Sequence, residues 1–291
     1  MRAFKTNAEL LELLPYLNGP RQLDLKIHVK FRNDIPNPDA VLEVYAHPWP
    51  NPKALLTILR QTYTRTWIAL HIINDGEMAD VDALLEQSDD LLKDVQGKFD
   101  DFHIFHMDYD ISTHIGNVLS KKFNVSSKRI PCYAFYIPVE KQEEIRKLDI
   151  KLPEGFTFCK LNPETDYQFV SSTWPYATKT EAANVKTKLE HLPSIGVKYD
   201  GQLVAFEMMH HTGAMNHLYT VPEFRGKGLG TAVELKLVQI IMDKGVMPFK
   251  TVSFGAPLGM SLTAKSSYWE KVVDERTKEQ IVVDFRDMQN L

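Results

Sequence analysis

The chain has 291 residues, of which 44% are hydrophobic and 25% charged, a composition typical of a globular protein with one large domain or two of ordinary size. A formal net charge of -4 argues against a general nucleic-acid binder, and no apolar run approaches the roughly 18 residues that a membrane span needs. The two cysteines, Cys132 and Cys159, form neither a disulfide framework nor a metal site. We therefore predict a soluble protein without metal, nucleic-acid or membrane partners.

The first half of the chain alternates between segments of strand type and segments of helix type. A helix is predicted from Met1 to about Leu17, and its acidic Glu9 and Glu12 are unlike a secretory signal and uncommon in a mitochondrial presequence. A cytoplasmic location is therefore expected, with a mitochondrial one as the alternative. Apolar patterns predict strands at Asp24–Lys30, Val41–Ala46, Thr66–Ile73, Phe102–Met107 and Ile130–Val139, and helices at Pro52–Thr62, Asp80–Phe99 and Asp110–Phe123.

A densely charged segment, Glu140–Lys151, separates this half from the next and closes on a Pro-Glu-Gly sequence. Such a segment buries little, so we place a domain boundary near residue 150 and expect domains at 1–150 and 151–291. The first domain contains no glycine-rich phosphate turn. Its residues indicate a mixed α/β domain and leave its role open.

The second half reads as a strand, two helices, three strands joined by hairpins, a helix, a strand, a helix and a final strand. Asp-Gly between two β-type runs is a strong hairpin signal, and a second hairpin is predicted at Thr212-Gly213. This order predicts an α/β (α+β) fold with mixed, mostly antiparallel sheets flanked by helices. The predicted elements are Phe156–Leu161, a helix beginning at Asn162, Thr178–Leu189, Pro193–Tyr199, Gln202–His210, Met215–Val221, a helix that ends at Lys244-Gly245, Thr251–Phe254, Ser261–Lys271 and Gln280–Phe285.

The turn after the strand Met215–Val221 carries the clearest chemistry. Pro222 stops strand pairing, and the run Arg225-Gly226-Lys227-Gly228-Leu229-Gly230 leads into an amphipathic helix. Glycines let backbone N–H groups approach an anion, and the first turn of a helix leaves N–H donors unpaired at the positive end of its dipole. The pattern therefore predicts a phosphate site, with an ordinary helix N-terminus as the alternative.

The turn is neither a P-loop nor a G-x-G-x-x-G dinucleotide turn. It reads R-x-x-G-x-G at Arg225, Gly228 and Gly230, preceded by V-P-E-F at 221–224. This resembles the acyl-CoA pyrophosphate loop of the GNAT superfamily of CoA-dependent N-acyltransferases. The resemblance implies acyl-CoA as co-substrate, bound by Tyr219, Thr220, Val221, Arg225, Gly226, Lys227, Gly228, Leu229, Gly230 and Thr231.

The element order of the second half is also the GNAT order, and three segments resemble the glycine N-acyltransferase family. They are Thr173-Trp174, Leu192-Pro193-Ser194 and the run from Ala205 to Arg225. This resemblance implies direct transfer of an acyl group from acyl-CoA to the amine of glycine or another small amino acid. It also implies that the first half is a degenerate, GNAT-like copy of the fold without a CoA site.

The general base is where this chain departs from that family. An amine must lose a proton before it attacks, and the family uses the glutamate of T-G-E-M, which is Ala214 here. If Thr212-Gly213 is a two-residue turn, His211 lies across from Ala214 and Glu207 shares its sheet face, so both are candidate bases. His210 and His217 face the other way unless a bulge intervenes. A polar hairpin end, or no protein base at all, is the alternative.

Many GNAT proteins supply the leaving thiolate with a proton from a tyrosine in N-x-x-A-x-x-x-Y on the last helix. Ser261, Ala264 and Tyr268 match this pattern in one register, with serine in place of asparagine. Tyr268 is therefore a candidate acid, and a buried aromatic with a bonded hydroxyl is the alternative. The rival functions are a catalytically impaired acyl-CoA-binding protein, an acetyltransferase for a protein or another amine, and an interaction scaffold.

Overall fold

The structure is a computed structural model that describes residues 1–96, 102–106 and 108–290. The end of the predicted helix Asp80–Phe99 and the last residue of the predicted strand Phe102–Met107 lie outside the described residues. The strands are β1 Arg2–Phe4, β2 Ala40–His47, β3 Ala54–Gln61, β4 Thr66–Ile72, β5 Phe102–His106, β6 Val125–Tyr136, β7 Phe156–Cys159, β8 Ser194–Tyr199, β9 Gln202–Met209, β10 Met215–Thr220, β11 Phe249–Ser253, β12 Glu270–Lys271 and β13 Val282–Asn290.

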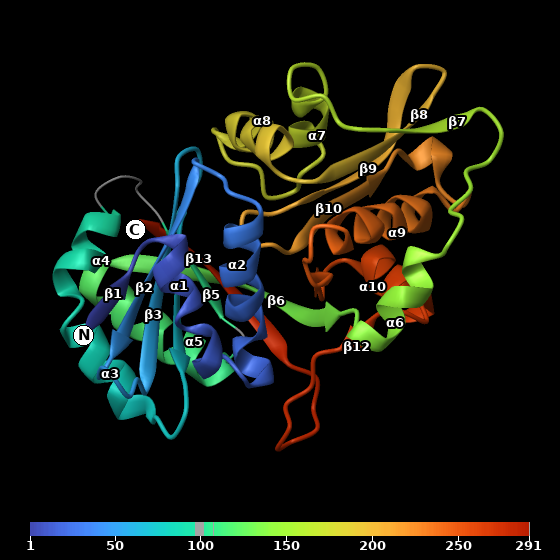
Figure 1. Ribbon diagram of the computed structural model, residues 1–291. Helices are drawn as coiled ribbons and strands as arrows, with labels where there is room; N and C mark the ends of the chain where they lie inside the picture. The colour runs from blue at the N-terminus through green and yellow to red at the C-terminus, as the bar shows by residue number, and fades with distance from the viewer. Residues whose placement is uncertain (97–101, 107, 291) are drawn as a thin grey trace.

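Helices flank these strands in two lobes, one for each half of the chain (Figure 1). The α-helices are α1 Asn7–Leu11, α2 Leu23–Asp34, α3 Met78–Glu86, α4 Asp89–Gln96, α5 Tyr109–Phe123, α6 Val139–Arg146, α7 Tyr167–Ser172, α8 Glu181–His191, α9 Leu229–Met242 and α10 Pro257–Lys265, with short 3₁₀ turns at Leu14–Tyr16, Pro20–Gln22 and Pro222–Phe224. None of the helices within the described residues combines the length and hydropathy needed to cross a bilayer.

The two halves repeat the same arrangement of strands in one continuous sheet. The strand order is β1-β2-β3-β4-β5-β13-β6-β11-β10-β9-β8-β7, with β12 beside β6. β4 and β5 run parallel in the first half, and β10 and β11 run parallel in the second. From either edge of the sheet towards its centre, the strands form three antiparallel pairings in succession and then one parallel pairing. The mixed, mostly antiparallel sheet predicted from the sequence is confirmed.

The last strand of each half lies in the sheet of the other half. β13 pairs with β5, and β6 pairs with β11. The two exchanged strands pair with each other antiparallel from Val282 opposite Tyr133 to Asn290 opposite Val125. Asp284 of β13 is fully buried and accepts hydrogen bonds from Arg129 Nε at 2.9 Å and Ser112 Oγ at 2.6 Å, so first-half side chains hold this second-half strand.

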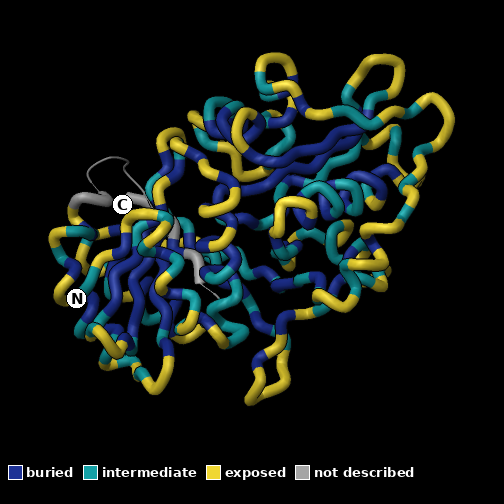
Figure 2. The backbone as a smooth tube through the Cα atoms, viewed as in Figure 1, coloured by how far each residue is buried: buried dark blue, intermediate teal, exposed yellow. Residues whose placement is uncertain are grey.

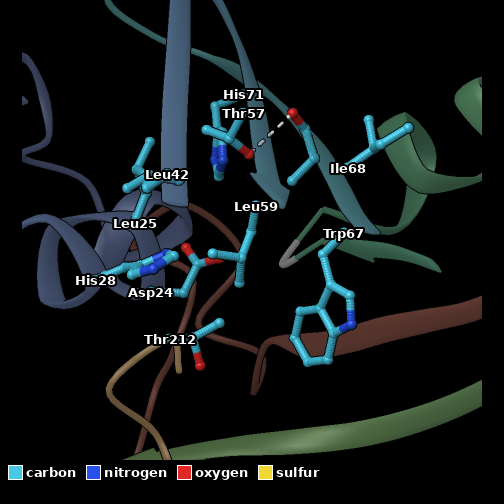
Figure 3. Close-up of a pocket in the computed structure, with 11 residues that line it drawn as sticks. Asp24, Leu25, His28, Leu42, Thr57, Leu59, Trp67, Ile68, His71 and Thr212 are labelled. Carbon is cyan, nitrogen blue, oxygen red and sulfur yellow. Dashed lines mark hydrogen bonds between the residues drawn. The ribbon is translucent and has the colours of Figure 1, made fainter. Parts of the chain in front are cut away.

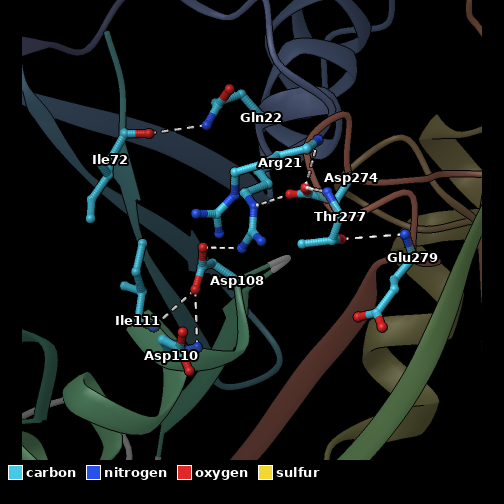
Figure 4. A network of polar contacts seen from close by, with 10 residues as sticks. Arg21, Gln22, Ile72, Asp108, Asp110, Ile111, Asp274, Thr277 and Glu279 are labelled. Carbon is cyan, nitrogen blue, oxygen red and sulfur yellow. Dashed lines mark hydrogen bonds and ion pairs between the residues drawn. The ribbon is translucent and has the colours of Figure 1, made fainter. Parts of the chain in front are cut away.

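A polar network also ties the β12–β13 connection to the first half (Figure 4). The Arg21 guanidinium contacts Asp108 and donates from Nε to Asp274 Oδ2 at 2.8 Å. Asp108 caps α5, and Asp274 accepts the backbone N–H groups of Arg276 and Thr277 at 2.9 Å. These N–H bonds and Arg21 lower the pKa of Asp274 to about 2.

Buried residues follow the strands through both lobes (Figure 2). Helix α2 joins several of their apolar clusters, because Leu25 and Val29 pack in the first-half core, Ile27 packs against β6 and β11, and Phe31 packs in the core of α9. The prediction of a strand at Asp24–Lys30 was wrong for this reason. A helix buried on several sides can show apolar residues at alternate positions.

Several further expectations differ from the structure. The predicted helix Pro52–Thr62 is strand β3, which is buried on both faces and so has no alternating pattern. The predicted N-terminal helix is the short strand β1 followed by α1 and a 3₁₀ turn. The predicted helix Ser261–Lys271 starts four residues earlier and ends at Lys265. The helix predicted to begin at Asn162 begins at Tyr167, and the charged segment Glu140–Lys151 contains most of α6, with Ile145 buried. The element order predicted for the second half is otherwise confirmed, with the two-residue strand β12 added before β13.

Candidate functional site

The glycine-rich turn forms an open cradle at the start of α9. Gly226 and Gly228 adopt the left-handed conformation, with φ of 77° and 78°, and nothing lies within 4 Å of the position a Cβ would take at either residue. The first helical hydrogen bond runs from the Ala232 N–H to the Gly228 carbonyl at 3.0 Å. The N–H groups of residues 229–231 precede that bond and have no partner within the helix, so they can receive an anion.

Two cations flank this cradle. Arg225 and Lys227 are both exposed, and Arg225 Nε donates to the Thr220 carbonyl at 3.0 Å, which fixes the guanidinium at the end of β10. Residues 225–231, all named from the sequence, therefore lie together around one turn. The arrangement suits a diphosphate, because it combines full charges with the positive end of a 14-residue helix.

A gap opens in the sheet next to this turn. Within the described residues, β10 and β11 share a single register pair, Met215 opposite Lys250. The equivalent parallel strands of the first half, β4 and β5, share three pairs. Beyond Met215 no further register pair joins β10 to β11 in the described part of the chain, so the backbone groups on this side of β10 can bind a polar ligand lying between the strands.

A β-bulge interrupts β10 inside the same gap. Asn216 lies opposite Met208 and Tyr219 opposite Phe206, so two residues, His217 and Leu218, stand against Glu207 alone. His217 adopts φ of 61°, which is uncommon for a residue with a side chain. Simple alternation would put His217 on the same face as Met215, which packs towards α9. The bulge turns it instead towards Phe206 and helix α7.

His217 is a candidate site residue, which strand alternation without a bulge would have put on the other sheet face. Its side chain is buried, its Nε2 lies 2.9 Å from Thr173 Oγ1, and its ring centroid lies 4.9 Å from that of Trp174. No hydrogen-bond partner of its Nδ1 is found within the described chain. Burial, together with the nearby Lys188 ammonium, lowers the pKa of His217 to about 3. The signal available in the sequence was the Asn-His pair in the strand, since both residue types favour the left-handed conformation.

Glu207 lies on the opposite face of the sheet from His217, above a buried ion pair. Lys250 contacts the Glu234 carboxylate, which also accepts a hydrogen bond from Trp269 Nε1 at 2.9 Å. Burial raises the pKa of Glu207 well above its usual range, and the Glu234 charge raises it further against the opposing effect of Lys250. This shift favours the protonated form of the Glu207 carboxyl. Its Oε2 atom has no hydrogen-bond partner within the described residues.

The hairpin before β10 has a three-residue loop instead of the predicted two-residue turn. The His210 N–H donates to the Ala214 carbonyl at 2.8 Å, and the Gly213 N–H donates to the His210 carbonyl at 3.0 Å. Gly213 has φ of 83°, as expected for a three-residue hairpin that closes on a left-handed residue. His210, and not His211, therefore lies across from Ala214.

The His211 ring is hydrogen-bonded at both nitrogens, between the first half and α8. Asn37 Nδ2 donates to His211 Nδ1 at 2.8 Å, and His211 Nε2 lies 3.1 Å from Asn184 Oδ1. Asn37 Oδ1 accepts the Asp39 N–H at 2.9 Å, which fixes its amide as the donor to Nδ1. Burial holds the pKa of His211 well below its usual range. The predicted role of His211 as a base stays a prediction, and these bonds favour a structural role.

Tyr268 lies beyond the end of α10, so it is not on the helix that the sequence pattern required. Its hydroxyl donates to Glu144 Oε1 on α6 at 3.0 Å, and desolvation together with this bond raises its pKa. The predicted role of Tyr268 as an acid stays a prediction.

Among the described residues, no group of three or more His, Cys, Asp or Glu side chains could hold a metal.

A small cavity lies between α2, strands β2–β4 and Thr212 of the second half (Figure 3). It measures about 30 Å³, room for a water molecule and little more. Burial raises the pKa of Asp24 to about 7 and lowers that of His28 to about 3, and Asp24 Oδ1 and His28 Nε2 have no hydrogen-bond partner in the described chain. Strands β4 and β5 stay paired over three register pairs, so the described residues of the first half show no equivalent of the gap between β10 and β11.

Comparisons with known proteins place these features in a family context. Residues 161–253 match the model of the Acetyltransferase (GNAT) family, a segment that holds the bulge, the gap and the glycine turn. A search of the curated proteins gave no match. The GNAT acetyltransferase superfamily is therefore supported for the second half by the family model.

Solved structures extend the likeness in fold to nearly the whole chain. A Drosophila protein superposes with a TM-score of 0.75 at 14% identity, over 99% of this chain and 97% of that one. A tandem GNAT protein from the clavulanic acid biosynthesis pathway superposes with a TM-score of 0.55 at 10% identity, over 99% and 97%. A GCN5-related N-acetyltransferase from Sphaerobacter thermophilus gives 0.53 at 11% identity, over 98% and 94%. At these identities the likeness shows the fold alone, a tandem GNAT-like arrangement.

Proposed function

We propose that this chain, whose second half carries the features of a GNAT acetyltransferase, transfers an acyl group from acyl-CoA to the amine of a small acceptor. The diphosphate of CoA would bind at residues 225–231, on the open N–H groups at the start of α9. The pantetheine arm would lie along Tyr219, Thr220 and Val221, against the unpaired edge of β10. The thioester would then reach the bulge, in the gap between β10 and β11.

The observation that carries this proposal is that the gap between β10 and β11 lies next to the cradle of residues 225–231. The same parallel pair in the first half is zipped over three register pairs and leads into no glycine turn. Among the described residues of the two repeated halves, the half whose parallel strands separate is also the half that carries the cradle. A purely structural role for either feature would not require the other beside it.

The acceptor we propose is glycine or another small amino acid, by direct attack on the thioester. This choice rests on the resemblance of the segments 173–174, 192–194 and 205–225 to glycine N-acyltransferases. Ala214, at the position of that family's glutamate, favours a second candidate function, an acyl-CoA-binding protein without catalysis. The two candidates share the donor site and differ in turnover.

Release of CoA thiol tests the proposal. Acetyl-, benzoyl- and longer acyl-CoA would each be offered with a panel of amino acids and simple amines, and binding of each acyl-CoA would be measured by calorimetry in parallel. We expect thiol release that requires one class of amine. Binding without release would favour the non-catalytic candidate, and the absence of any binding would overturn both.

A further inference from the structure

Resting on the acyl transfer proposed above, we propose that His217 is a catalytic residue that accepts a proton from the attacking amine through its Nδ1 atom. The bulge in β10 places this histidine beside the gap, on the α7 side of the sheet. It lies two residues before Tyr219, on the strand edge proposed to bind the pantetheine arm. His217 thus lies three residues after Ala214, which occupies the position of the glutamate base in the glycine N-acyltransferase family.

The hydrogen bonds around the ring fix which nitrogen carries the proton. Thr173 Oγ1 lies 2.8 Å from the Val170 carbonyl, and a carbonyl can only accept, so the hydroxyl proton is committed to it. Thr173 Oγ1 must then accept from His217 Nε2, at 2.9 Å. Nε2 therefore bears the hydrogen, and Nδ1 is left with its lone pair. A buried lone pair without a partner is costly, which is typical of a functional site.

The surroundings of the ring keep it neutral. Lys188 of α8 is the nearby charge that disfavours an imidazolium, and it is paired with Glu181, whose Oε1 lies 3.9 Å from the ammonium. The aromatic rings of Trp174 and Phe206 also lie against the imidazole. The neutral ring keeps the Nδ1 lone pair available to accept a proton.

The proposed step conserves atoms and charge. The amine nitrogen forms a bond to the thioester carbonyl carbon, and one N–H proton passes to His217 Nδ1. The C–S bond then breaks with its electron pair on sulfur, and the imidazolium returns the proton to the thiolate. The products are an amide and CoA thiol.

The variant His217→Asn tests the inference with little disturbance of the backbone. Asparagine adopts the left-handed conformation readily and can accept a hydrogen bond, but it cannot take up a proton. We expect kcat/KM for the amine to fall about 100-fold, the lower range for a lost general base, with an unchanged Kd for CoA. His191→Asn, at the partly exposed end of α8, is the matched control and should keep its rate.

A second variant separates catalysis from folding. Thr173→Val removes the hydroxyl that fixes the tautomer, so nitrogen NMR should show an unprotonated Nδ1 in the wild type and a mixture in the variant, with an intermediate loss of rate. A rate for His217→Asn within threefold of the wild type, or a protonated Nδ1 in the wild type, would overturn the role of His217 alone. A wild type that binds acyl-CoA but acylates no amine would overturn the proposed function, and this inference with it.

Discussion

Met215 lies opposite Lys250 in the one register pair that joins β10 to β11 within the described residues, and the strands part beyond it. The Lys250 ammonium contacts Glu234 on α9 and lies 4.1 Å from the centroid of the Trp269 ring. The residue that closes the strands at one end thus also ties β11 to the helix that starts at the glycine turn. This buried contact fixes the position of α9, and so of the glycine turn at its start, relative to the point where β10 and β11 separate.

Replacing Lys250 should therefore destabilise the protein strongly. Lys250→Met leaves the buried Glu234 carboxylate without its cation, which costs about 3–5 kcal/mol of unfolding free energy. The double variant with Glu234→Gln should cost less than the sum of the two single changes, because no orphaned charge remains. Urea denaturation of all four proteins measures this coupling, and additive effects would show that the pair is energetically independent.

Gly228→Ala should weaken CoA binding about tenfold, the equivalent of about 1.4 kcal/mol. An alanine resists φ of 78°, so the cradle and its N–H groups would shift. Gly245→Ala is the matched control, since Gly245 follows the other end of α9 with φ of 74° and equally open surroundings. Both variants should lose similar stability, and calorimetry should find weaker CoA binding in the first alone. Equal affinities would remove the cradle from the CoA site.

The stability of the wild type relative to Glu207→Gln should fall as the pH rises. Burial holds the folded pKa of Glu207 above its ordinary value of 4.5, so its contribution is fully present below pH 4.5 and is lost as the pH rises towards the folded pKa. Each pH unit in that window removes up to about 1.4 kcal/mol. Denaturant titrations of both proteins from pH 4 to 8 measure the difference, which a glutamate ionised in the folded state would leave flat or reverse.

His211→Ala should reduce stability and spare the turnover of each folded molecule. The change strands the Asn37 amide and the Asn184 carbonyl in a buried site, at a cost on the order of 3 kcal/mol. The measurement is kcat at a temperature where the variant is fully folded by circular dichroism. A fall of 100-fold under those conditions would restore His211 as the base.

The sequence was informative where structure depends on short-range chemistry. The glycine turn was predicted residue by residue, since strand end, cradle and helix start lie within one short segment, 219–231. The elements that failed depend on distant neighbours. Helix α2 has an alternating pattern because several apolar clusters cover it, and β3 lacks such a pattern because both its faces are buried. The period of the apolar residues therefore depends on how many sides of an element are buried, as well as on whether it is a helix or a strand.

The interior of the site was harder to predict for a similar reason. The face of His217 depended on whether β10 contains a bulge, which the sequence left open. The inserted residue of a bulge reverses the faces of the residues that follow it. The hairpin register failed by one residue, which moved His210 into the place expected for His211. Errors of one residue are small in sequence and large in a sheet, because neighbouring side chains point to opposite faces.

The crossing of β6 and β13 has a consequence for any attempt to cut the chain in two. A fragment ending near residue 150 would carry β6 away from β11, and would leave β5 as a bare edge where β13 belongs. Each fragment would expose an unpaired strand edge and would also carry the strand that pairs with the exposed edge of the other fragment. When expressed separately, the two fragments should aggregate or stay unfolded. When they are expressed together, they should associate and form the strand pairs of the intact protein. The boundary near residue 150 would then mark a repeat of the chain, and not a division into independent folding units.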